Sequence, residues 1–266
     1  MIEYMKIITN KFNDALRLYL VAFYFAAGDI KARYRRSVIG PFWIVLSTIL
    51  SVILFGLVWG TLLNMEKSKF IPSFATGFIL WYFISGCLVE SPSIFLHNVK
   101  IIRNIKTSLL IFPVQLILKH LIIFFHNALI ILVVLIIYPP VIINFWLLLL
   151  AFFGLFLLVA NLLWIGIIFS MIGARFRDLE PLVASIMPVL FFISPVIYTI
   201  DRMPVSSSFI IWSNPFTYFI NIVRDPLMGQ VPEHFVYYTV IGMLIGGWAL
   251  TLWLTSKKYK RIPFWI

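Results

Sequence analysis

Residues 145–172 form an apolar run without a single charged residue. A helix of about 20 apolar residues crosses the hydrocarbon core of a bilayer, so this run is long enough to do so. The whole chain shares this character, because 62% of its 266 residues are hydrophobic and only 12% are charged, against about 25% charged in soluble domains. A soluble globular protein and a disordered chain are therefore excluded. The apolar runs are continuous and do not alternate, which argues against an outer-membrane barrel.

Apolar runs of this kind recur along the chain and predict an all-α integral membrane protein with six transmembrane helices. Residues 41–256 would form the transmembrane domain, between an N-terminal segment, 1–40, and a basic tail, 257–266. The predicted spans cover residues 41–62, 70–96, 113–138, 145–172, 181–200 and 235–255, of which the fifth is expected to be broken at Pro188 and Pro195.

The distribution of basic residues predicts the orientation. Six spans place both ends of the chain on one side of the membrane. Sixteen of the 21 Lys and Arg residues lie on that side, and four lie in loops on the other. By the positive-inside rule both termini are therefore expected to be cytoplasmic. The net charge of +11 is then attributed to membrane lipids and not to nucleic acid. The single cysteine, Cys87, excludes an internal disulfide.

The N-terminal segment contains an apolar stretch, 18–27, that is too short to span and has basic residues on both sides. We expect an amphipathic helix in the cytoplasmic interface. A signal peptide cleaved near Ala26-Ala27-Gly28 is the alternative, although the basic cluster that follows would oppose translocation.

The outer loop, 201–235, has an apolar and aromatic centre at 209–223. Fifteen residues cannot cross a core of about 30 Å at about 1.5 Å per residue. Asn214-Pro215 would also interrupt a single helix. The pattern predicts two short helices that re-enter the outer leaflet or lie on it, with an ordinary surface loop as the alternative.

Two opposite charges, Glu90 and Lys119, fall inside the second and third spans at similar heights above the cytoplasmic interface. Because charges inside a membrane are costly, they usually pair. The sequence predicts an intramembrane ion pair of Glu90 with Lys119, with His120 as another possible partner. In the alternative interpretation, Lys119 extends alone to the interface.

Several motifs are absent from the sequence. It contains no G-x-x-x-x-G-K-[ST] loop for ATP and no H-E-x-x-H or Cys cluster for a metal. Neither catalysis nor a bound cofactor is expected in this chain. A membrane-embedded glycosyl or lipid transferase stays the alternative class. That function needs clustered acids at one membrane face, whereas the acids here are scattered.

Three motifs carry a resemblance to a known family. Residues 29–43, DIKARYRRSVIGPFW, resemble the D-[IL]-K-x-R-Y-x-x-S-x-[LI]-G-x-x-W motif of ABC-2 type permeases that export polysaccharides such as O-antigen, capsule and teichoic acid. Residues 176–179 resemble the F-R-D-[IL] loop of that family. Asn214-Pro215-Phe216 with Arg224 resembles its N-P-[LF]…R segment.

The resemblance implies a permease subunit that exports lipid-linked O-antigen polysaccharide across the inner membrane. It implies a homodimer working with two copies of a cytosolic ABC ATPase, which would bind ATP and Mg²⁺. Capsule polysaccharide, teichoic acid or a small hydrophobic compound remain alternative cargoes within the same fold.

Candidate roles follow for individual residues. An arginine cluster at the start of the first span would receive the lipid pyrophosphate head, or simply anchor the chain to lipid; it comprises Arg33, Arg35 and Arg36. Aromatic side chains would carry the glycan, or only pack; they are Trp43, Trp59, Phe191, Phe192 and Tyr198.

Two cytoplasmic segments, 97–112 and 173–180, are expected to contact the ATPase, with simple lipid contact as the alternative for the first. Their candidate coupling residues are Lys100, Arg103, Lys106, Arg175, Arg177 and Asp178. The re-entrant segment would gate the exit through Asn214, Pro215 and Arg224.

Overall fold

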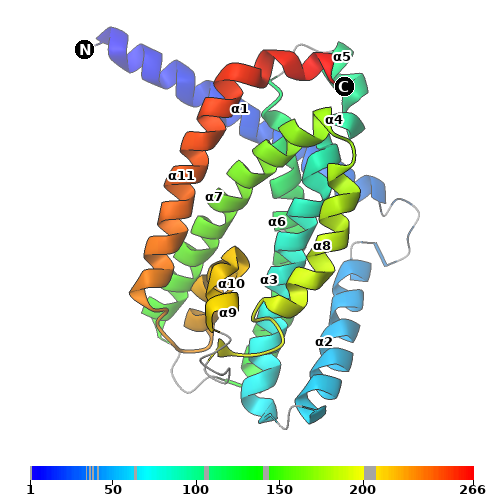
Figure 1. Cartoon of the computed structure of the whole chain (residues 1–266), viewed down its shortest axis with the longest axis vertical. Coiled ribbons are helices and arrows are strands. Elements are labelled where there is room, and N and C mark those ends of the chain that lie inside the picture. The colour runs from blue at the N-terminus through cyan, green and yellow to red at the C-terminus, as the bar shows by residue number, and fades with distance from the viewer. Residues whose placement is uncertain are drawn as a thin grey trace.

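The computed structural model describes residues 2–33, 35, 37, 39–40, 42–62, 65–104, 108–139, 144–200 and 208–266. Its regular elements in this part of the chain are all helices (Figure 1). They are α1 (Ile2–Arg33), α2 (Phe42–Leu62), α3 (Lys67–Glu90), η1 (Ser91–Ser93), α4 (Ile94–His97), α5 (Val99–Asn104), α6 (Ile111–Ile137), α7 (Phe145–Arg175), α8 (Leu179–Ile193), α9 (Ser208–Ser213), α10 (Pro215–Leu227), α11 (His234–Lys258) and η4 (Tyr259–Phe264).

Among the described residues, five helical segments are long and apolar enough to cross a membrane, which confirms an all-α integral membrane fold. They correspond to the first, second, third, fourth and sixth predicted spans. The second is built from α3, η1 and α4 in succession, Lys67–His97.

The fifth predicted span, 181–200, is wrong in its bounds and length. The helix there, α8, begins at Leu179, ends at Ile193 and has 15 residues, which is about 22 Å. It ends because Pro195 follows: the residue before a proline is disfavoured in the helical region, and Ser194 is extended with ψ 148°. By length alone α8 does not reach across a bilayer.

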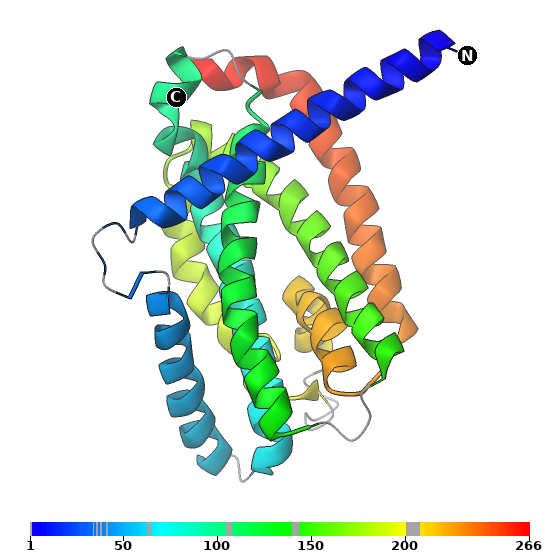
Figure 2. The same cartoon turned by 180° about the vertical axis from the view of Figure 1, so that it is seen from behind.

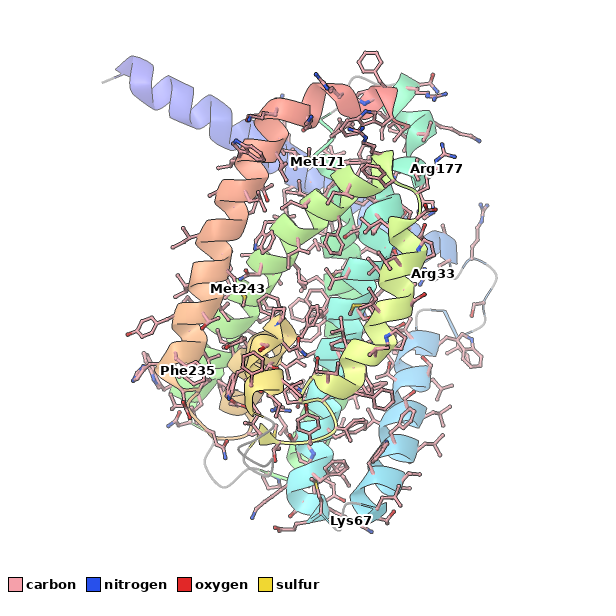
Figure 3. All side chains as sticks on the ribbon, in the orientation of Figure 1. Arg33, Lys67, Met171, Arg177, Phe235 and Met243 are labelled. Atoms are coloured by element: carbon pink, nitrogen blue, oxygen red, sulfur yellow. The ribbon has the colours of Figure 1, made fainter. Side chains whose placement is uncertain are left out.

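Both marked chain ends lie at the same end of the bundle (Figure 1). The turn between α7 and α8 lies there as well, and Figure 3 shows Arg177 in that turn with Met171 close by. Lys67 and Phe235 lie at the opposite end (Figure 3). This arrangement agrees with an even number of chain crossings.

Helix α1 lies obliquely across this end of the bundle (Figure 2) and packs against α6. Ala22, Ala26 and Ile30 face inward at four-residue spacing and are buried. Two alanines in this stripe let the helices approach closely. Helix α1 continues unbroken through residues 26–28.

The apolar outer segment forms two helices that separate at Asn214, as the sequence predicts. Helix α10 packs against α7, α11 and α3. Its residues Phe216–Arg224 are all buried. Helix α10 therefore re-enters the bundle, whereas Phe209 and Ile210 of α9 are exposed.

Helices α2, α8 and α11 have few buried residues, and α2 and α8 lie on one side of the bundle (Figures 1 and 2). In α2 the buried residues are Ile44, Thr48, Val52, Gly56 and Gly60, a single stripe at four-residue spacing. In α8 only Val183 and Met187 are buried. Helix α3 contacts both of them and forms the centre of the core.

Candidate functional site

A charged cluster joins three helices near the end of the bundle that carries the termini. The Glu90 carboxylate, at the end of α3, is in contact with the Lys119 ammonium of α6. The same carboxylate lies 3.5 Å from His120 Nε2 and 3.8 Å from the Arg33 guanidinium of α1. The Lys119 side chain is only 12% exposed. One carboxylate thus lies between basic side chains of α1 and α6.

The packing of α3 on α6 brings these residues together. The rings of Phe83 and Phe124 lie 5.3 Å apart between the two helices. One turn further, His120 lies against Gly86, where an added Cβ would approach the imidazole to 2.5 Å. A glycine at residue 86 is therefore what lets the imidazole lie beside Glu90.

The first motif has structural contacts of its own. Gln115 on α6 donates a hydrogen bond to the Asp29 carboxylate on α1 at 2.7 Å. After α1, the Ser37 hydroxyl accepts the Gly40 N–H at 3.1 Å. Gly40 has φ 61°, which a glycine adopts without strain. The motif therefore fixes α1 on α6 and turns the chain into α2.

The three predicted lipid-head arginines differ in their surroundings. Arg33 lines a small pocket between α1, α2 and α6 together with Asp29 and Lys119. Its guanidinium also lies 3.8 Å from the Glu90 carboxylate. Arg35 is exposed. Arg36 lies outside the described residues.

The five predicted channel aromatics do not form one surface. Trp43 is 49% exposed and Phe192 is 61% exposed. Phe191 instead packs edge-on against Phe78 and Trp81, with ring centroids 6.2 and 5.8 Å apart. Trp59 is half-buried against the core, and the half-buried Tyr198 donates a hydrogen bond to the Ile193 carbonyl.

The two predicted coupling segments lie at the end of the bundle that carries the termini. In 97–112 the structure describes the helix α5, Val99–Asn104. Its Lys100 is exposed, and Arg103 donates a hydrogen bond to the Ile266 carbonyl oxygen at 2.7 Å. Lys106 lies outside the described residues. In the second segment Arg175, Arg177 and Asp178 are all exposed.

The predicted gate residues anchor α10 to the end of α8. Asn214 accepts the Phe216 N–H at 3.0 Å as the N-cap of α10, and it donates to the Ser194 hydroxyl at 2.8 Å. Pro215 occupies the first turn, where its missing N–H is tolerated. Arg224, only 3% exposed, donates to the Pro195 carbonyl and, at 2.8 Å, to Asn221.

Sequence reasoning missed several contacts that depend on tertiary structure. Two hydrogen bonds join residues far apart in the chain: that of Gln115 to Asp29, and that of Arg224 to the Pro195 carbonyl. The signal for the latter was present: a proline that ends a helix leaves carbonyls unpaired. In the part of the chain that is described, no group of three His, Cys, Asp or Glu side chains could hold a metal ion.

Comparison with known proteins identifies a family model described as ABC-2 type transporter, which matches residues 22–228. Two curated relatives from Klebsiella pneumoniae are both named O-antigen export system permease protein RfbA. One is 24% identical over 236 residues, which is 87% of this chain and 90% of the relative. The other is 25% identical over 225 residues, covering 84% and 85%.

Proposed function

The chain belongs to the ABC-2 type transporter family, and on that premise we propose that it is the permease subunit of an ATP-driven exporter of lipid-linked O-antigen polysaccharide. The observation that carries this proposal is its similarity, over most of its length, to two permeases named for O-antigen export. We place the protein in the inner membrane with both termini in the cytoplasm, as the 16 to 4 distribution of basic residues supports.

A partner subunit supplies the work of transport. The chain has no P-loop. A cytosolic ABC ATPase, present in two copies, therefore binds ATP with Mg²⁺ and hydrolyses the ATP. The ATPase docks on segments 97–112 and 173–180. Their shared position at the end of the bundle that carries the termini, and the exposure of Lys100, Arg177 and Asp178, support this docking site.

A second copy of the chain completes the transport path. It faces the side formed by α2 and α8, whose apolar side chains are largely exposed in a single copy. Trp43 and Phe192 are exposed on these two helices. A sugar ring stacks its C–H face on such aromatic surfaces while its hydroxyl groups stay hydrated, so the polymer slides without one deep binding site.

The lipid head binds at the start of the first span. Arg35, which is exposed, and Arg36 offer forked donors that suit phosphate oxygens. Arg33 contributes at the edge of this cluster while it is also close to Glu90. At the other end, α9 and α10 gate the exit of the glycan, and the contacts of Asn214 and Arg224 with residues 194–195 tie this gate to α8.

The decisive experiment follows labelled lipid-linked glycan in a strain that lacks this chain, with the unaltered chain restored as the control. Export predicts that glycan accumulates on the cytoplasmic side while surface glycan is lost, and that restoration reverses both. Glycan that is never assembled would contradict export and support the transferase class. Normal surface O-antigen would contradict the cargo and direct the search to capsule, teichoic acid or a small hydrophobic compound.

A further inference from the structure

Residues 259–266 do not extend away from the bundle but fold back across its end. Element η4 follows α11 and leads the chain over the end of α7 to α5 (Figures 1 and 2). Ile262 is 1% exposed and Ile266 is 9% exposed. Both belong to a buried apolar cluster that includes Phe95, Phe112 and Met171. This segment is docked by its own apolar side chains, although its sequence suggests only a basic tail.

Polar contacts fix the segment to the first predicted coupling region, 97–112. The Tyr259 hydroxyl accepts the Leu109 N–H at 2.9 Å and lies 3.4 Å from the Ser108 hydroxyl. Leu109 precedes α6, where N–H groups have no partner within the helix, so a side-chain acceptor is favourable. At the far end, Arg103 donates to the Ile266 oxygen at 2.7 Å.

The same segment contacts the second predicted coupling region, 173–180. The Arg175 guanidinium lies 5.7 Å from the centroid of the Trp265 ring and 5.3 Å from that of Phe176. Cation–π contacts of this length are favourable. Residues 259–266 thus join two regions that are far apart in the sequence and that belong to different helical hairpins, α3–α6 and α7–α8.

We propose that residues 259–266 act as a strap that makes segments 97–112 and 173–180 one interaction surface for the ATPase subunit. The ATPase part of this inference rests on the proposed function. A force applied to either segment is then delivered to α3, α6, α7 and α8 together, because the strap prevents the segments from moving independently. The family model ends at residue 228, so the match itself assigns no role to the strap.

The first test measures docking of the strap and does not depend on transport. A water-soluble maleimide is applied to the full-length chain carrying Ile262→Cys or Phe264→Cys; residue 264 is 87% exposed, and the native Cys87 is fully buried. Ile262→Cys is expected to react about tenfold more slowly, since a buried thiol must wait for local opening. Adding Tyr259→Phe with Ile266→Ala, which removes strap contacts from the strap side alone, should remove most of this difference.

Equal labelling of the two cysteines without the added substitutions would overturn the docked strap. A cysteine at residue 262 could itself loosen the strap. Hydrogen exchange of residues 259–266 is therefore also measured in the unsubstituted chain. Slow exchange there supports docking, and exchange as fast as in an unfolded peptide contradicts it.

The second test measures coupling in the reconstituted transporter. Tyr259→Phe with Ile266→Ala, which changes only residues of the strap, is compared with Tyr238→Phe, which removes a hydroxyl from an exposed tyrosine on α11. The strap variant is expected to retain the ATPase subunit but to export several-fold less cargo for each ATP hydrolysed. Unchanged export per ATP, with labelling showing the strap released, would overturn the coupling role. If the unsubstituted chain neither binds an ATPase nor exports glycan, the proposed function fails together with this coupling role, while labelling still decides whether the strap is docked.

Discussion

Glu90 is the carboxylate partner of more than one basic side chain. Besides Lys119 it faces His120 and Arg33. Its loss would leave the poorly exposed side chains of Lys119 and His120, and the more exposed Arg33, without their carboxylate. Loss of Lys119 would still leave Glu90 beside the other two groups. The pair is therefore asymmetric, and single substitutions can measure this asymmetry.

We predict that Glu90→Gln destabilises the protein more than Lys119→Gln does. Removing one partner of a buried charge pair costs about 3 kcal/mol or more, and Glu90 has the larger number of partners. Thermal unfolding in detergent, followed by size-exclusion chromatography, measures the difference. Lys69→Gln is the matched control, because its pair with Glu66 at 3.1 Å is exposed and such pairs contribute about 0–1 kcal/mol.

The double reversal Glu90→Lys with Lys119→Glu tests the pair in another way. Rescue should be incomplete, because Arg33 and His120 would then face a lysine. Full recovery of stability would show that these two side chains do not interact with residue 90.

Substitutions at two adjacent phenylalanines of α8 distinguish a role in packing from a role in transport. Phe191→Ala should lower the unfolding temperature, because the ring packs between Phe78 and Trp81 and truncating a packed Phe costs about 3–5 kcal/mol. Phe192→Ala should leave stability nearly unchanged and reduce export, because this ring is 61% exposed. Thermal unfolding and surface glycan are measured for both variants. Normal export by Phe192→Ala would remove this ring from the proposed path.

At the scale of elements, the contact between α7 and α10 depends on a glycine. A Cβ added at Gly154 would overlap the Ile222 carbonyl oxygen. Backbone carbonyls of a buried helix cannot move aside as a flexible side chain can, so the two helices would have to separate.

We predict that Gly154→Ala destabilises the re-entrant helix by about 1–3 kcal/mol or more, as overpacking does. Gly242→Ala on α11 is the matched control, since a Cβ there meets no atom within 4 Å. Unfolding temperature and surface glycan are compared for both variants. Equal behaviour would contradict the close approach of α7 and α10.

The sequence predicts most elements because apolar runs and their interruptions are local. Five spans and the break at Asn214 follow from run length and from proline. Run length extends the fifth span to residue 200, because apolar residues continue beyond Pro195, whereas α8 ends before that proline and continues through Pro188. The strap could not be predicted, because its basic residues indicate only a basic tail, whereas Ile262 and Ile266 are buried in a cluster with residues of α4, α6 and α7.

At the scale of the whole molecule, the two ends of the bundle should face different compartments. We predict that Lys67→Cys reacts with a membrane-impermeant maleimide added to spheroplasts, and that Arg177→Cys reacts only after the inner membrane is opened. Both residues are exposed and lie at opposite ends (Figure 3), while the native Cys87 is buried. The reverse pattern would invert the proposed orientation and place both termini outside.

The shortness of α8 has a consequence for the surrounding lipid. About 22 Å of helix faces a hydrocarbon core of about 30 Å. Lipid that meets a hydrophobic length too short for it thins locally, at a modest cost for each ångström of mismatch. In a single copy, before the proposed second copy covers the side formed by α2 and α8, the bilayer beside α8 is therefore thinned, and the hydrophobic barrier there is narrower than beside the longer helices. A hydrated polymer that crosses beside α8 has a shorter apolar distance to travel.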